Sequence, residues 1–364
     1  MIFSCAKTDN NSINLDQMDK VSVRDLVDSI SVVQLETKEE SLIGGIQRII
    51  SHKNRFYIVD YTQQAVLCFN ANGEYLFKIN KRGRGPEEYN YLGEFNIDPY
   101  NDQLMILVPW GNILYYDLDG NFISKVKLPS EVQAYNEVYA LNRDKLLFIS
   151  WNEYQASYYS KVSGKILKRF LHVTNDKQYI FNPLHKTYYY SDSLFFNNVG
   201  INNDVLNLTD EIQSIAYSWN FGKNNNTTEQ INEAQQYEQR MSNERNPNSS
   251  PINNLGNKDF PNYYTFTSFE TKKYRITSLL YKDPGTFLMI FNDKNDGKNY
   301  VFRETTEGIG FYFLSVYESS LITYKTKFVE NYFSKNVLTP DQFKIVENHN
   351  PNNDNPFLVI YHFK

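Results

Sequence analysis

The sequence predicts an all-β fold, a six-bladed β-propeller built from four-stranded antiparallel blades. Three observations predict it: an internal repeat with a period in the mid-forties, tight Asn/Asp-Gly turns between apolar segments, and abundant tyrosine and phenylalanine. The 29 Tyr and 25 Phe favour strands, because flat rings pack well on a pleated sheet. A chain of 364 residues suits several ordinary domains or one large all-β domain, and the repeat favours the single domain.

Each copy of the repeat is an apolar segment, a tight turn and a second apolar segment. The copies, the last more divergent, are Leu67–Ile79, Leu114–Val126, Tyr158–Phe170 and Val205–Trp219. Their turns are 47, 44 and 46 residues apart, at Gly73, Gly120, Gly164 and Asp210. Asn/Asp-Gly turns permit positive φ and join adjacent antiparallel strands. Four short strands per unit at this period are typical of a propeller blade.

The first two blades can be divided into individual strands. Blade one is predicted near Ile46–Ile50, Phe56–Asp60, Ala65–Asn70 and Tyr75–Asn80. Blade two is predicted near Glu94–Asp98, Gln103–Val108, Ile113–Asp117 and Phe122–Lys127. Alternation predicts that Tyr75, Phe77 and Ile79 share one face of their strand.

The period breaks at an Asn-rich insertion over residues 222–262. Thr227–Glu244 is rich in helix formers, and we expect a helix that either caps one rim or lies solvated on the surface. Strands resume at Tyr274–Leu280, Thr286–Phe291, Asn299–Arg303, Phe311–Val316 and Leu321–Tyr324, with a further helical stretch near Lys325–Val346. A ring of blades must close or leave an open edge, so Ser29–Thr37 is expected beside Phe357–Phe363 in blade six.

The N-terminal MIFSCAKTDNN resembles the end of a bacterial lipoprotein signal, in which the cysteine is lipidated. We therefore expect either lipid attachment at Cys5 or an ordinary exposed cysteine there. Residues 1–20 would be signal remnant and tether, and residues 21–364 a single propeller domain. Cys68, in an apolar segment, is expected to be a small buried thiol, and neither cysteine forms a C-x-x-C pair.

The segment Phe56–Tyr89 resembles the NHL-type propeller repeat, and more closely the six-bladed propeller lipoproteins common in Bacteroidetes. The matching pieces are QLET (Gln34–Thr37), YIVD (Tyr57–Asp60), GRGPEEY (Gly83–Tyr89), FETKKY (Phe269–Tyr274) and the ending NPFLVIYHFK. The resemblance implies the fold and an outer-membrane lipoprotein of the cell envelope, facing the periplasm or the cell surface. The arginine that NHL repeats carry after the Asp is missing here, which argues against NHL-style partner binding.

The loop Lys81–Leu92 (KRGRGPEEYNYL) is predicted to cross from the outer strand of blade one to the inner strand of blade two. Its two glycines are expected to allow backbone angles that other residues resist. A phosphate cradle would need a third glycine and a following helix, and both are missing. The loop is therefore a structural corner or a ligand contact, and its candidate ligand-binding side chains are Arg82, Arg84, Glu87 and Glu88.

Other candidate sites come from aromatic and acidic residues. Trp110, Trp151 and Trp219 lie near strand ends, where they would stack on a sugar or pack between blades; the first two are counted as ligand candidates. Asp60 and Asp98 are expected to end strands at the same rim, where carboxylates would hold calcium or cap the strand ends. The sequence contains neither H-E-x-x-H nor G-x-S-x-G, so no catalytic residue is assigned.

These features favour a binding module. The net charge of -5 argues against a nucleic-acid partner, and without a long apolar run the chain would meet a membrane only through a lipid anchor. The expected partner is a glycan, a peptide or an envelope protein, recognised through one rim, without a cofactor. The alternatives are a hydrolase or lyase acting on carbohydrates or lactones, with or without calcium, and a subunit beside an outer-membrane transporter.

Overall fold

The strands of the computed structural model form six four-stranded antiparallel sheets, which confirms the six-bladed propeller. The structure describes residues 12–108, 111–130, 135–150, 153–172, 187–197, 203–210, 213–243, 251–283, 285, 287–311, 315–317, 320–327 and 337–364. Two compact units are distinguished: a four-blade unit (residues 27–173 and 312–363) and a two-blade unit (residues 1–26, 174–311 and 364). We call the edge of a sheet at which its first, inner strand begins the N-rim, and the opposite edge the C-rim.

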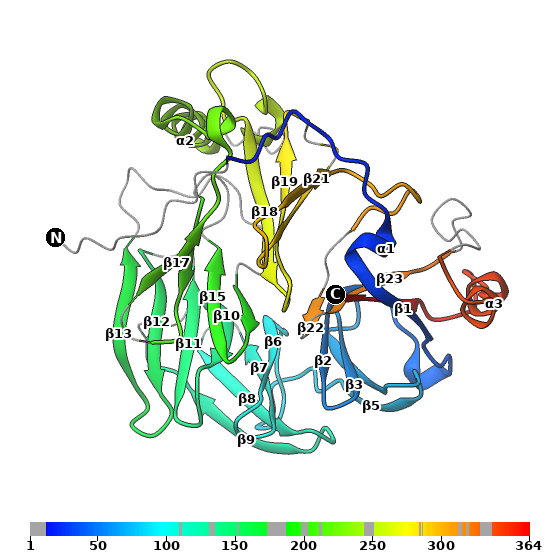
Figure 1. The fold of residues 1–364 in the computed structure, drawn as a ribbon. Coiled ribbons are helices and arrows are strands. Elements are labelled where there is room, and N and C mark those ends of the chain that lie inside the picture. Colours follow the sequence, from blue (N-terminus) through cyan, green and yellow to red (C-terminus); the bar gives the residue numbers. More distant parts are fainter. Residues whose placement is uncertain are drawn as a thin grey trace. The chain divides into compact units, whose positions relative to one another are not determined.

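Three sheets of the four-blade unit follow the chain in order, from an inner first strand to an outer fourth strand (Figure 1). Blade one contains β2 (Ile46–His52), β3 (Arg55–Asp60), β4 (Ala65–Asn70) and β5 (Tyr75–Ile79). Blade two contains β6 (Glu94–Asp98), β7 (Gln103–Val108), β8 (Asn112–Asp117) and β9 (Phe122–Lys127). Blade three contains β10 (Tyr135–Ala140), β11 (Lys145–Ser150), β12 (Tyr154–Ser160) and β13 (Lys165–His172). The strands of blades one and two agree with the predicted limits to within two residues.

Blade six pairs the first strand of the described chain with the last, as the sequence predicted. Its strand order is β1 (Val27–Gln34), β24 (Phe357–Phe363), β23 (Ser320–Lys325) and β22 (Ser315–Tyr317). The pairing of β1 with β24 runs from Val27 opposite Phe363 to Gln34 opposite Phe357. The helix expected near 325–346 is shorter in the described residues: α3 covers Pro340–Asn348, and Lys325 belongs to β23. Thr339 fixes the start of α3, because its side chain accepts a hydrogen bond from Gln342 N.

The turn glycines between the third and fourth strands have the predicted conformation. Gly73 has φ +84° and Gly120 has φ +83°, a region that other residues adopt only with strain. A Cβ at Gly73 would also lie 2.1 Å from the carbonyl oxygen of Gln34. Cys68, on the strand before Gly73, is fully buried, as predicted.

The register of the fourth strand differs from the prediction. Cys68 lies opposite Phe77, but the next residue, Phe69, lies opposite Tyr75, so Leu76 forms a β-bulge. Tyr75 therefore packs with Phe69 in one core cluster, and Phe77 packs in another. The prediction of one shared face was wrong because a bulge reverses the alternation. The residues skipped at the corresponding bulges of blades two and three are Ile123 and Leu167.

The two-blade unit contains blades four and five and the Asn-rich insertion. Blade four contains β14 (Thr187–Tyr190), β15 (Ser193–Asn197), β16 (Asp204–Asn207) and β17 (Ser214–Ser218). Blade five contains β18 (Tyr263–Glu270), β19 (Tyr274–Tyr281), β20 (Phe287–Asp293) and β21 (Asn299–Phe302). The predicted insertion helix is α2 (Thr228–Asn243), and it packs on blade five, because Ala234 joins a buried cluster with Tyr264 and Leu280. No helix in the described ranges is long and apolar enough to cross a bilayer.

Part of the N-terminal segment that was expected to be a tether is folded. Ile13 and Leu15 are buried, and α1 (Val23–Leu26) precedes β1. The segment, blue in Figure 1, crosses the ends of β19 and β21 before it reaches α1. Residues 12–20 therefore belong to the folded two-blade unit, because apolar side chains there find a core to enter.

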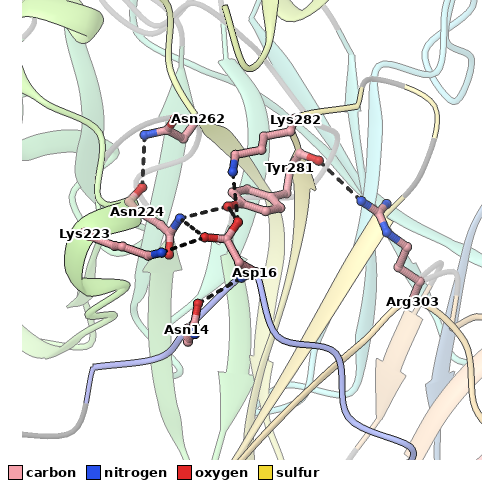
Figure 2. Close-up of polar contacts among 8 residues, drawn as sticks. All are labelled: Asn14, Asp16, Lys223, Asn224, Asn262, Tyr281, Lys282 and Arg303. Carbon is pink, nitrogen blue, oxygen red and sulfur yellow. Dashed lines mark hydrogen bonds and ion pairs between the residues drawn. The ribbon is translucent and has the colours of Figure 1, made fainter. Parts of the chain in front are cut away.

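Asp16 fastens this segment to blade five and to the start of the insertion (Figure 2). Its carboxylate accepts hydrogen bonds from four groups: Lys282 Nζ at 2.8 Å, Tyr281 OH at 2.5 Å, Asn224 Nδ2 at 3.2 Å and Lys223 Nζ at 3.1 Å. These donors, Lys282 foremost, hold the pKa of Asp16 well below its usual range. The first residues of the insertion, Lys223 and Asn224, are thus bonded to the N-terminal segment through Asp16.

Candidate functional site

Three charged side chains occupy one equivalent position in three consecutive inner strands. Arg48 lies on β2, Glu94 on β6 and Glu137 on β10. Each pairs with the fifth residue of the second strand of its blade, namely Val59, Leu107 and Ile149. Inner strands of a propeller line the central channel, so the fold places these charges on the channel side, toward the N-rim.

Two of these side chains form an ion pair, and the third acts on them electrostatically. Arg48 Nη1 forms an ion pair with Glu94 Oε1 and donates to the carbonyl of Phe95 at 3.1 Å. Tyr139, two residues along β10, donates its hydroxyl to Glu137 Oε2 at 2.6 Å. Only 13% of the Arg48 side chain and 8% of the Glu94 side chain are exposed. We call Arg48, Glu94, Glu137 and Tyr139 the inner-strand cluster.

The inner-strand cluster contains one carboxylate more than its single cation can neutralise. Burial raises the pKa of Glu94 to about 7, against the opposing effect of Arg48 and with the added repulsion of Glu137. At neutral pH the Glu94 carboxyl is therefore divided between its two protonation states. It can donate a hydrogen bond in one state and accept hydrogen bonds in the other.

This chemistry suits hydrogen bonding to hydroxyl groups and proton transfer. Guanidinium and carboxylate groups form paired hydrogen bonds, and a carboxyl with a pKa near 7 exchanges protons at physiological pH. In the residues that the structure describes, no group of three or more His, Cys, Asp or Glu side chains is arranged to hold a metal ion.

The loop over residues 81–92 connects β5 to β6, so it crosses at the N-rim of blades one and two. Three contacts fold it into a tight corner: Glu88 Oε2 accepts from Gly85 N at 2.7 Å, Tyr89 OH donates to Gln64 O at 2.7 Å, and Lys125 Nζ donates to Glu88 O at 2.9 Å. The Glu88 side chain is therefore used inside the loop.

The loop glycines are required for space and not for unusual angles. Neither Gly83 nor Gly85 has a positive φ, which corrects the expectation from the sequence. A Cβ at Gly83 would instead lie 2.0 Å from Glu88 Oε2.

Arg82, Arg84 and Glu87 remain exposed on this loop. Within the described part of the chain they form no side-chain ion pair, so all three stay available to a partner at the N-rim. Cys5, Trp110 and Trp151 lie outside the described residues. Trp219 is buried and stacks on Phe221, with ring centroids 6.3 Å apart, as expected for packing.

Asp60 and Asp98 cap strand ends and lie at opposite rims. Asp60 ends a second strand, at the N-rim, whereas Asp98 ends an inner strand, at the C-rim, so the expectation of a shared rim was wrong. Asp60 accepts four N–H bonds, two from backbone amides of its own turn, one from Gly44 N and one from Gln63 Nε2. Asp98 accepts four similar bonds, including one from Lys161 Nζ at 2.7 Å. Donors therefore surround both carboxylates, which leaves no oxygen site for calcium there.

The inner-strand cluster was missed by motif searches because its members are far apart in sequence. A usable signal was present: Arg48, Glu94 and Glu137 are 46 and 43 residues apart, close to the blade period. Charged residues that recur at the blade period inside predicted inner strands indicate a shared level of the channel.

Comparisons with known proteins support the fold. A family model described as "Domain of unknown function (DUF4934)" matches residues 9–362. Among solved structures, the chain is similar to a candidate exported protein from Bacteroides fragilis NCTC 9343, at 15% identity and a TM-score of 0.73, covering 96% of this chain and 98% of that one. It is also similar to a member of the DUF4221 family from Bacteroides vulgatus ATCC 8482, at 11% identity and a TM-score of 0.52, covering 96% and 99%. No curated protein matches the chain in sequence.

Proposed function

The chain belongs to the family described as domain of unknown function DUF4934, and we propose that it is an exported binding module that holds a glycan at the inner-strand cluster. The observation that supports this proposal is the coincidence of Arg48, Glu94 and Glu137 at one position of three inner strands. Buried charges are costly, and apolar residues would stabilise a core at least as well. A ligand that uses these groups explains their presence.

Glycan hydroxyls match the donors and acceptors of this cluster. Arg48 offers only donors, an ionised Glu137 offers only acceptors, and Glu94 changes role with its proton. The exposed Arg82 and Arg84 at the N-rim would contact the part of a longer ligand that extends beyond the cluster.

The test is a glycan-array screen followed by calorimetric titration of the best glycan. We expect Arg48→Gln and Glu137→Gln to weaken binding at least tenfold, and Arg82→Ala/Arg84→Ala to weaken only longer glycans. Glu74→Gln is the matched control, since Glu74 is exposed at the turn between β4 and β5. Absence of glycan binding by the wild type, with capture of a peptide or envelope protein instead, would refute the glycan assignment.

We also propose that the protein is exported and anchored to the outer membrane through a lipid on Cys5. The sequence around Cys5 and the similarity to a candidate exported protein support this proposal. Metabolic labelling with a tagged fatty acid should mark the wild type and not Cys5→Ser. Equal labelling of both proteins would exclude Cys5 as the attachment site. In a separate experiment, co-purification with an outer-membrane transporter would identify that neighbour as the partner.

A second candidate function is hydrolysis of a glycan or lactone at the same cluster. The pKa of Glu94, about 7, favours it, because a carboxyl that is protonated near neutral pH can serve as a general acid beside the Glu137 carboxylate. In that case Glu94→Gln should abolish turnover of a bound glycan and leave its affinity within a few fold. Binding without turnover in the wild type would reject the enzyme and retain the binding module.

A further inference from the structure

Blade five, in the two-blade unit, carries a second group of charges, in which Glu270 is buried and Arg275 and Lys294 are partly exposed. Glu270 ends β18, Arg275 lies at the start of β19 and Lys294 follows β20, so all three lie at the C-rim of blade five. Two tyrosines of the inner strand β14, Tyr188 and Tyr190, contact this group. Glu270 belongs to the FETKKY segment that the sequence resemblance included.

The charge balance here is opposite to that of the inner-strand cluster. Two cations face one carboxylate: Lys294 Nζ is 3.3 Å and Arg275 Nε is 3.9 Å from Glu270 Oε2. The other oxygen of Glu270 is 3.5 Å from Tyr188 OH. The Lys294 and Tyr188 distances are at the long end of hydrogen bonding and the Arg275 distance is beyond it, so a single carboxylate satisfies the two cations only loosely.

Arg275 is held in place but leaves its donors unused. Its guanidinium lies over the ring of Tyr217, 4.6 Å from the centroid, and its Nε is buried without a hydrogen-bond partner. Within the described ranges none of its N–H groups donates a hydrogen bond, although 34% of the side chain is exposed. A guanidinium fixed by an aromatic face and a carboxylate has lost most of its conformational freedom before a ligand arrives.

Lys294 is fixed in the same way. Its ammonium lies 4.1 Å from the centroid of the Tyr190 ring, and only 18% of the side chain is exposed. A cation over an aromatic ring keeps its charge while its orientation is restricted. The two cations thus border one position with a net positive charge on a chain whose net charge is -5.

We propose that Arg275 and Lys294 bind the carboxylate of a ligand, either an acidic sugar or an acidic peptide. A planar carboxylate matches two parallel N–H groups of guanidinium, and Lys294 supplies the second charge. This site is independent of the glycan proposal, because it lies on another blade and uses other residues. It defines a ligand class, carboxylates, that the inner-strand cluster would repel.

The test is calorimetric titration at constant ionic strength with sodium glucuronate, N-acetyl-glutamate and sodium sulfate, with glucose as the neutral probe. We expect saturable binding of one or both carboxylates and none of glucose. Glucuronate and N-acetyl-glutamate distinguish the sugar source from the peptide source. Arg275→Ala should weaken binding at least tenfold, and Arg275→Lys should weaken it nearly as much, because the charge remains and the planar fork is lost.

Lys294→Gln provides a second variant, which removes one charge and leaves Arg275 in place, and should weaken binding several-fold. Lys298→Gln is the matched control, since Lys298 lies over Tyr300 on the same blade, 4.4 Å from the ring centroid. Wild-type protein that binds neither carboxylate, or variants that bind as tightly as the wild type, would overturn the proposal. Tighter binding of sulfate than of either carboxylate would overturn the assignment of the ligand class.

Discussion

Replacing Glu94 by glutamine should make the protein more stable at alkaline pH. In the folded protein the pKa of Glu94 is raised from 4.5 to about 7, and the side chain is 8% exposed. Between these two pH values the folded state holds a proton that the unfolded state has lost, so stability falls as pH rises. Each pH unit of difference is worth about 1.4 kcal/mol, so the total is about 3 kcal/mol.

Glutamine resembles the protonated carboxyl in shape and charge. We therefore expect wild type and Glu94→Gln to have similar unfolding free energies at pH 5, and the variant to be about 3 kcal/mol more stable at pH 8. Urea unfolding at several pH values measures the unfolding free energy of both proteins. Other titrating groups affect both proteins equally, so their effects cancel in the difference between the two.

The groups facing Glu94 set the direction of two supporting measurements. Glu137→Gln removes a repulsion, so it should lower the folded-state pKa of Glu94 and reduce the stability difference that Glu94→Gln makes at pH 8. Arg48→Gln removes an attraction, so it should raise the pH at which the folded protein loses the Glu94 proton. Parallel pH profiles of wild type and Glu94→Gln, or a variant that is less stable than wild type at pH 8, would refute the reasoning, because attraction by Arg48 would then outweigh burial.

Three further changes test the anchors of the fold by urea unfolding. Asp16→Asn should lower the unfolding free energy by about 1–2 kcal/mol at pH 7, a modest loss because the carboxylate is one-third exposed. The loss should shrink below pH 4, because the partners that depress the pKa of Asp16 stabilise only its ionised form. A loss that stays the same at all pH values would contradict this. Asp98→Ala should cost about 2–4 kcal/mol by leaving four donors without an acceptor, and a loss under 1 kcal/mol would argue against the cap. Gly83→Ala should lower the unfolding free energy by about 1 kcal/mol because its Cβ displaces Glu88, and by much less in a protein that already carries Glu88→Ala. If the double variant instead loses the sum of the two single losses, the steric explanation is excluded.

Much of the fold was predictable because its determinants are local. The turn glycines, such as Gly73, repeat at the blade period, and their positive φ follows from the residue itself. The closure of β1 on β24 followed from a general requirement, since a blade missing its outer strand would expose an open edge.

The predicted candidate sites fared differently, because sequence specifies residue type but not surroundings. The loop over residues 81–92 was placed correctly between two blades, yet the use of Glu88 inside it became visible only from its contact with Gly85. The pairing of Asp60 and Asp98 at one rim failed because strand number, and hence strand direction, decides the rim.

By itself, then, the sequence determined the repeat, the turns and the strands of blades one and two, since each depends on neighbours within a few residues or on a fixed period. The closure followed from the need to cover an open edge, whereas the inner strand of blade five, β18, was not predicted. Tertiary structure decided which faces the side chains occupy and which charges meet. A single bulge at Leu76 reverses the alternation of a strand, and only the pairing with β4 reveals it. Arg48, Glu94 and Glu137 influence one another because successive blades bring equivalent positions near each other, and burial then sets the chemistry of Glu94.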